Sequence, residues 1–79
     1  MRVFVLTDEW VQDFEHGMSV MVFDTITKAQ AELKKRVAEI KEWCVFDEEV
    51  SDPNGFEGWK TGEWNEWHTQ ITIEGKEVQ

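Results

Sequence analysis

Apolar residues gather in two short runs near the start of the chain, on either side of a polar loop. Residues 2–11 (RVFVLTDEWV) and 18–24 (MSVMVFD) are rich in β-branched and aromatic side chains, which favour strands. The intervening loop, residues 12–17, is polar, and Gly17 is able to adopt the positive φ that hairpin loops often require. This pattern predicts a β-hairpin whose two strands carry apolar side chains on both faces.

A helical period follows the hairpin. One apolar stripe, with members three or four positions apart, contains Ala29, Leu33, Val37, Ile40 and Cys44. Thr27 and Gln30 have the spacing of a capping box, in which the two side chains bind backbone N–H groups at the start of a helix. We therefore expect one amphipathic helix from Lys28 to about Cys44.

The second half of the chain contains a turn signal and one further strand pattern. Asp52–Gly55 (DPNG) is typical of a turn, because Pro fixes φ and Asn or Gly tolerates left-handed geometry. Residues 67–74 alternate apolar and polar side chains, which predicts a half-buried strand ending near Gly75. The fold class expected for residues 1–79 is thus a single α+β domain. It is a two-layer ββαβ unit, an antiparallel sheet of about three strands in the order 2-1-3 with one helix packed on one face.

One helix covers only one face of such a sheet, yet the first two strands are apolar on both. An uncovered apolar face is either an interaction site or an aggregation risk. The second face therefore requires a cover, and three are open: the segment 45–64, a second copy of the chain, or a partner.

The segment GFEGWKTGEWNEWH, residues 55–68, is the most unusual stretch. A four-residue turn at residues 60–63 would make it a hairpin. Its opposite pairs would be Trp59 with Trp64, Glu57 with Glu66, and Phe56 with Trp67. Because Trp67 belongs to the inward side of the last strand, the Phe56–Trp67 pair would be core. The other two pairs would point outward, either as an aromatic–acidic contact surface or as a cover for the second sheet face.

Charge favours the contact surface. The chain has 17 acidic and 8 basic residues, a net charge of −9. Residues 28–44 hold five basic and three acidic residues, so they carry +2 and the remainder carries −11. This balance disfavours direct binding of nucleic acid or an anionic membrane, and it favours a basic protein partner. The predicted partner-binding residues are Asp47, Glu48, Glu49, Asp52, Glu57, Trp59, Glu63, Trp64 and Glu66.

Catalytic and metal chemistry have little support in the sequence. Cys44 lies on the apolar stripe, where an inert buried thiol is the usual finding, and neither His16 nor His68 has a neighbour at metal-ligand spacing. Glu57 and Glu66 could form the carboxylate pair of a glycosidase, but so small a fold leaves little room for a cleft. We predict no enzyme activity, no cofactor and no metal. The single cysteine and the absence of a leader-like or membrane-spanning segment predict a cytoplasmic protein.

The start of the chain resembles small uncharacterised proteins of phages and mobile elements. The similarity covers roughly residues 2–40 and rests on VFVLT in the first strand and on MVFDTITKAQAEL, which leads from the second strand into the helix. No functional residues carry over. The resemblance implies an accessory protein or inhibitor that binds a protein of the host cell, in the host cytoplasm.

These observations together predict a non-enzymatic, acidic protein-binding module. It would engage a basic surface of a host protein through the Trp-rich segment 47–66. A host protein that handles nucleic acid is one such partner, for which this chain would act as a nucleic-acid mimic. Two alternatives stay open: a homodimeric structural module, and a non-catalytic sugar-binding domain that uses the Trp59–Trp64 pair.

Overall fold

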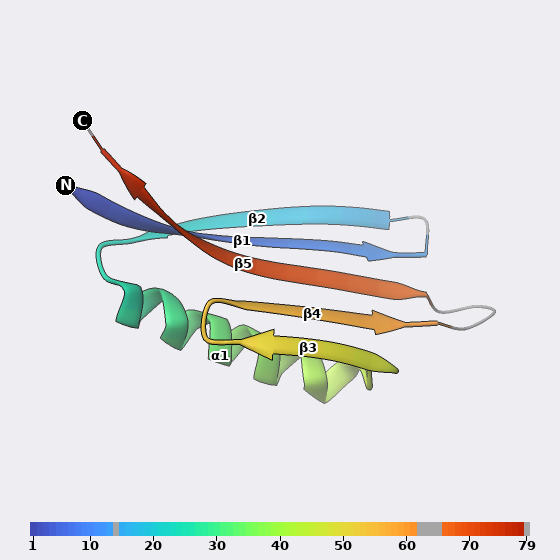
Figure 1. Cartoon of the computed structure of the whole chain (residues 1–79). Coiled ribbons are helices and arrows are strands. Elements are labelled where there is room, and N and C mark those ends of the chain that lie inside the picture. Colours follow the sequence, from blue (N-terminus) through green and yellow to red (C-terminus); the bar gives the residue numbers. More distant parts are fainter. Residues whose placement is uncertain (14, 62–65, 79) are drawn as a thin grey trace.

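Five strands form one antiparallel sheet in the order β2-β1-β5-β4-β3, with a single helix on one face (Figure 1). The computed structural model describes residues 1–13, 15–61 and 66–78. The elements are β1 (Arg2–Gln12), β2 (Glu15–Phe23), α1 (Ile26–Trp43), β3 (Glu48–Asp52), β4 (Gly55–Lys60) and β5 (Trp67–Glu77). In Figure 1 the sheet lies in front of α1, so the viewer sees the face that the helix does not cover.

The α+β class, the first hairpin and the helix are confirmed, but the three-stranded sheet of order 2-1-3 is wrong. β5 does lie beside β1, pairing along its whole length from Arg2 with Glu77 to Gln12 with Trp67. The error is the missing hairpin β3–β4, which turns at residues 53 and 54 and pairs through β4 with the far side of β5. The described part of the segment 45–64, residues 45–61, therefore widens the sheet instead of covering its second face.

The helix begins two residues earlier than the capping-box pattern predicted. Thr25 is the cap: its backbone is extended, and its Oγ1 accepts a hydrogen bond of 3.2 Å from the backbone N–H of Lys28. A Ser or Thr with extended backbone at this position satisfies one of the N–H groups that lack a partner within the helix. At the other end, the N–H of Cys44 donates to the carbonyl oxygen of Ile40 at 3.0 Å.

The core lies between the sheet and α1 and is built on four buried residues, one from each of four elements. They are Leu6 of β1, Leu33 of α1, Phe56 of β4 and Ile71 of β5. Phe46, from the link between α1 and β3, contacts Phe56 edge-on with ring centroids 5.7 Å apart. The same ring lies against Gly58, where an added Cβ would come within 2.9 Å of it. Gly58 is thus required for the close approach of Phe46 to the sheet.

Gly17 has a different role from the one its sequence position predicted. The positive φ of the first turn falls at Asp13 (φ 53°), a residue type that tolerates this region. Gly17 lies within β2 opposite Trp10, and a Cβ on it would lie 2.2 Å from the indole ring. The glycine therefore makes room for Trp10.

No helix in the described part of the chain has the length and apolar character needed to cross a bilayer.

Candidate functional site

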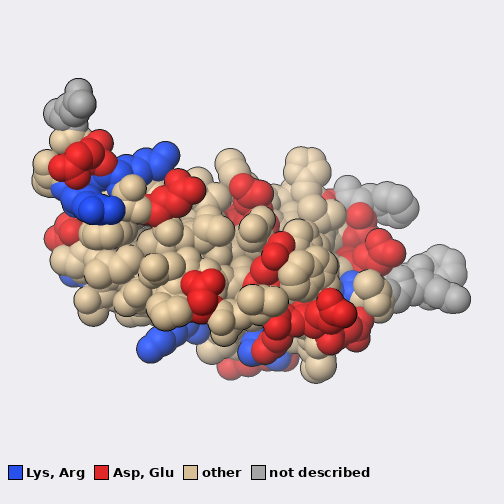
Figure 2. All heavy atoms as spheres, viewed as in Figure 1, with Lys and Arg blue, Asp and Glu red and all other residues tan. Residues whose placement is uncertain are grey.

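The sheet has one face against α1 and one face that the helix leaves uncovered, which we call the open face. Because opposite residues in an antiparallel ladder share a face, the register assigns every strand position to one of the two. The open face contains Val3, Val5, Thr7, Glu9 and Val11 of β1, His16, Met18, Val20 and Val22 of β2, His68, Gln70, Thr72, Glu74 and Lys76 of β5, Gly55, Glu57 and Trp59 of β4, and Glu48, Val50 and Asp52 of β3. Figure 2 shows this side of the molecule.

A polar and aromatic cluster occupies the open face where β4 and β5 meet. Trp59 and His68 are opposite residues, and their rings are stacked with centroids 5.4 Å apart and planes 15° apart. His68 Nε2 lies 2.9 Å from Oε2 of Glu57, which is two positions from Trp59 and so on the same face. The glutamate and the indole thus hold the imidazole between them. The cluster offers a carboxylate beside two stacked rings, an arrangement suited to a Lys or Arg side chain.

Carboxylates are spread across the rest of the open face. Glu9 is exposed on β1, Glu48 and Asp52 on β3, and Glu74 on β5. Among the described strand positions of this face, Lys76 is the one basic residue, and it lies near the end of β5. Figure 2 shows red carboxylates scattered over the surface, with blue basic groups mostly at its rim. The open face is therefore an acidic surface.

Exposed apolar side chains accompany these acids. Along β2, Met18, Val20 and Val22 are 63%, 53% and 62% exposed. Val11 and Val50 are also exposed on this face. A shallow depression of about 670 Å³ lies at one end of β1, β2 and β5, where its lining includes Glu9, Val11, Met18 and His68. Apolar and acidic side chains thus alternate over a broad, gently hollowed surface.

The predicted register of the Trp-rich hairpin is wrong, although its facing holds for the described residues. Trp59 opposes His68 where Trp64 was expected, a shift of four positions. The cause is the connection: β4 ends at Lys60 and β5 begins only at Trp67, so the four-residue turn was too short. A one-residue slip would have exchanged the two faces, whereas an even shift preserves them. Phe56 accordingly faces the core, as predicted.

The inner aromatic residues are in contact although they are not opposite each other. Phe56 opposes Ile71, and Trp67 opposes Lys60. Trp67 instead contacts the ring of Phe46 edge-on, with centroids 6.2 Å apart, and Phe46 in turn contacts Phe56. A Trp67 packed on the helix side is consistent with its predicted inward orientation.

Four of the predicted partner-binding residues lie on the open face: Glu48, Asp52, Glu57 and Trp59. Of these, Asp52 also accepts a 2.8 Å hydrogen bond from the backbone N–H of Asn54, which fixes the β3–β4 turn. Glu63 and Trp64 lie outside the described residues. The Glu57–Glu66 carboxylate pair does not form, because Glu57 opposes Gln70 and the Glu66 backbone contacts Asp13 near the first turn.

Two of the predicted acids make contacts within the fold and lie off the open face. Asp47 Oδ2 accepts hydrogen bonds from Thr61, at 2.8 Å from the backbone N–H and 3.1 Å from the hydroxyl, and these bonds lower the pKa of the Asp47 carboxyl. Glu49 lies on the helix side of β3, where its Oε1 is 2.6 Å from Nζ of Lys41. Neither is part of the open face.

Three components of this face were not among the predicted partner-binding residues. Glu9 is one of its acids and comes from β1, far in sequence from the segment 47–66. The alternation of residues 67–74 places His68 on the side of the strand opposite Trp67, but its contact with Glu57 depends on the register, which no local pattern reveals. The apolar row on β2 was visible in the alternation of Met18, Val20 and Val22.

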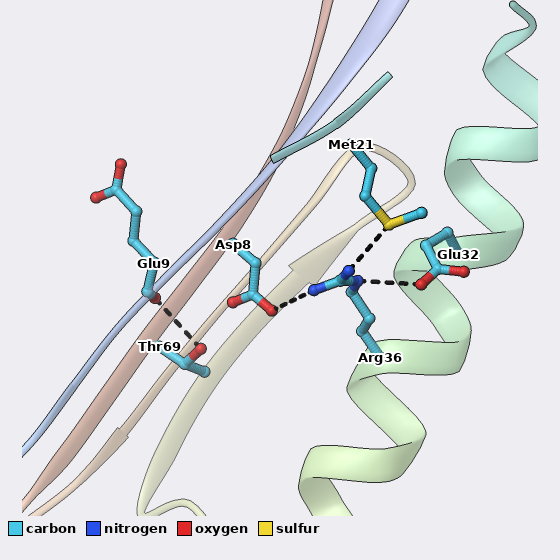
Figure 3. Close-up of polar contacts among 6 residues, drawn as sticks. All are labelled: Asp8, Glu9, Met21, Glu32, Arg36 and Thr69. Carbon is cyan, nitrogen blue, oxygen red and sulfur yellow. Dashed lines mark hydrogen bonds and ion pairs between the residues drawn. The ribbon is translucent and has the colours of Figure 1, made fainter. Parts of the chain in front are cut away.

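The opposite side of β1 carries a buried polar cluster (Figure 3). Asp8 is 6% exposed, and its Oδ2 accepts a 2.9 Å hydrogen bond from Nη1 of Arg36 on α1. Nε of Arg36 donates to Oε1 of Glu32 at 3.1 Å, and its Nη2 lies 3.0 Å from the sulfur of Met21. Figure 3 shows Asp8 directed toward the helix and Glu9 directed away from it. The cluster joins α1 to the sheet and is separate from the open face.

Metal-ligating groups and the single cysteine add no second candidate site among the described residues. No group of three or more His, Cys, Asp or Glu side chains within them is arranged to hold a metal ion. Cys44 is buried, and this desolvation raises the pKa of its thiol, which disfavours the reactive thiolate. The sequence matches no protein-family model, and neither curated proteins nor solved structures yielded a match.

Proposed function

We propose that this chain is a non-enzymatic binding protein whose open face binds a basic surface of a partner protein. The observation that carries the proposal is the composition of that face, on which Glu9, Glu48 and Glu57 accompany the stacked Trp59–His68 pair. The net charge of −9 would steer a basic partner toward the molecule over distances comparable to the Debye length.

The cluster around Trp59 supplies specific contacts for such a partner. A Lys or Arg placed on an indole face gains about 0.5–2 kcal/mol, and the Glu57 carboxylate lies within reach to pair with the same cation. The exposed side chains of Met18 and Val20 supply apolar area of the kind found in protein interfaces. A partner that combines basic and apolar side chains matches this surface best.

Mimicry of nucleic acid has weaker support. Residues of one strand that share a face are about 6.6–6.8 Å apart, while duplex DNA carries one charge per about 1.7 Å of its axis. The carboxylates of the open face are interrupted by apolar residues and so fall well below that density. Sugar binding by a Trp59–Trp64 pair is also disfavoured, because the residue opposite Trp59 is His68.

The resemblance at the start of the chain makes host proteins the first partners to test. We would immobilise the protein, recover partners from a bacterial lysate, purify the strongest one and measure its Kd by calorimetry. The double variant Glu57→Gln, Trp59→Ala should weaken binding at least about tenfold, since it removes two contacts of about 1 kcal/mol each. Binding should also weaken as the salt concentration rises.

The control removes one charge more than the test variant, and it does so on the other side of the molecule. Glu39 and Glu42 are exposed residues of α1, so Glu39→Gln, Glu42→Gln removes two charges without touching the open face. This control should leave the Kd within about twofold, in line with the small effect of remote surface charges. Equal losses for both double variants would show that only net charge matters, and no loss for Glu57→Gln, Trp59→Ala would place the binding surface elsewhere.

A further inference from the structure

The two outer strands of the sheet, β2 and β3, differ in how well they are protected against pairing with a strand of another chain. β2 has nine residues, and among the described residues only β1 pairs with it, so one of its edges presents backbone groups that have no ladder partner. From His16 to Phe23 it contains no Asp, Glu, Lys, Arg or Pro. Charged residues and Pro are the usual means by which an edge strand resists pairing with another chain. β2 has none of them over eight consecutive positions.

The opposite edge has the expected protection. β3 is only five residues long, and Glu48, Glu49 and Asp52 make three of them acidic. Two copies of β3 brought together would oppose like charges, which is destabilising. Two copies of a chain with a net charge of −9 repel each other least where their surfaces are uncharged. The edge of β2 is such a place.

We infer that two copies of this chain pair through their β2 strands, antiparallel, about a two-fold axis at Val20. In this register Val20 opposes its own copy, and Met18 opposes Val22 of the second copy on both sides of the axis. The three exposed apolar side chains of β2 would then all meet apolar partners. A second copy is the occupant that fits, because the row Met18, Val20, Val22 is self-complementary and a two-fold interface closes on itself.

The symmetry also fixes the shape of the pair. Antiparallel pairing of two identical edges requires a two-fold axis perpendicular to the sheet, and opposite residues then share a face. The result is a continuous ten-stranded sheet with both helices on one side and both open faces on the other. This inference does not depend on the function proposed above, although it would place two copies of the acidic surface side by side.

Disulfide trapping tests the pairing directly. Opposite Cα atoms in an antiparallel ladder are about 4.5 or 5.5 Å apart, which is within the range that a disulfide spans. Val20→Cys, in a Cys44→Ala background, should form a covalent dimer under mild oxidation. Val50→Cys is the matched control, since Val50 is an equally exposed valine (60% against 53%) on the open face of the other edge strand. It should stay monomeric, and equal crosslinking of the two variants would overturn the inference.

Light scattering after size exclusion gives a second, non-covalent test. The unmodified chain should be dimeric at high micromolar concentration, Val20→Lys should be monomeric with an unchanged circular-dichroism spectrum, and Val50→Lys should remain dimeric. Added salt should strengthen the dimer by screening repulsion between two acidic chains, whereas it should weaken the binding of a basic partner. The two proposals can thus fail separately. A monomeric wild-type chain, or a Val20→Lys variant that is still dimeric, would refute the β2 interface.

Discussion

The buried pair between Asp8 and Arg36 allows the strongest stability prediction. Arg36→Met keeps an unbranched apolar stem on α1 but removes the guanidinium, whose Nη1 lies 2.9 Å from Asp8 Oδ2. The Asp8 side chain is 9% exposed, and its Oδ1 already lacks a hydrogen-bond partner among the residues that the structure describes. The variant would therefore leave a buried carboxylate with neither oxygen paired.

The expected loss follows from that burial. Removing one partner of a buried ion pair costs about 3–5 kcal/mol. Because the Arg36 side chain is 20% exposed and water can reach it, we expect the lower end, about 3 kcal/mol. A domain of this length has a total stability of about 4–12 kcal/mol. With a urea m-value of about 1 kcal/mol/M, the midpoint of unfolding should fall by about 3 M.

Urea unfolding followed by tryptophan fluorescence is a suitable assay, with Lys28→Met as the control. Lys28 and Asp24 also form a 2.9 Å pair, but both side chains are more than 60% exposed, so the midpoint should hardly move. The double variant Asp8→Leu, Arg36→Met should recover most of the loss, since replacing a buried ion pair with apolar side chains is often neutral. A loss below about 1 kcal/mol for Arg36→Met, or no recovery in the double variant, would refute the reasoning.

Two further predictions concern local contacts. Gly58→Ala should destabilise the fold by about 1–3 kcal/mol in the same urea assay, because its Cβ would come within 2.9 Å of the Phe46 ring. The control is Gly75→Ala, whose Cβ meets only the end of a flexible side chain and should change stability by less than about 0.5 kcal/mol. Equal losses for the two variants would contradict this prediction. The Asp47 carboxyl should titrate below the ordinary Asp value of about 3.9 in an NMR experiment, because of the hydrogen bonds from Thr61. Its contribution to stability is then complete above that ordinary value and is lost as the pH falls through the lowered pKa. A midpoint at or above the ordinary value would show that these bonds do not persist in solution.

Local sequence patterns predicted the helices and strands whose buried side chains mark them in the sequence. The helix was visible because Leu33 and Val37 lie on one stripe. β1 was visible because it is rich in β-branched and aromatic residues, and β5 because its side chains alternate in polarity. β3 escaped notice because all of its five residues are exposed, so no alternation marks it. An edge strand needs only backbone pairing on one side, and EEVSD has little β-propensity of its own.

For the candidate site too, local patterns predicted some features and not others. The side of the sheet on which a side chain lies could be predicted, because alternation along one strand does not depend on the neighbouring strands. Glu57 and Trp59 do lie on the open face. Which residues of β4 oppose which residues of β5 could not be predicted, because this register depends on the length of the connection between the two strands. The contact of His68 with Glu57 and the contribution of Glu9 both arise only after the sheet is assembled.

The position of β5 in the sheet has a consequence for how the chain folds. Among the strands of the described residues, β5 alone joins the β1–β2 hairpin to the β3–β4 hairpin. Its partners on β1 precede it by 55 to 75 residues, from Gln12 with Trp67 to Arg2 with Glu77. Contacts between such distant residues form slowly, and an isolated two-stranded hairpin is marginally stable. During synthesis the sheet can close only once β5 has emerged, so until then both edges of the first hairpin are exposed to other chains.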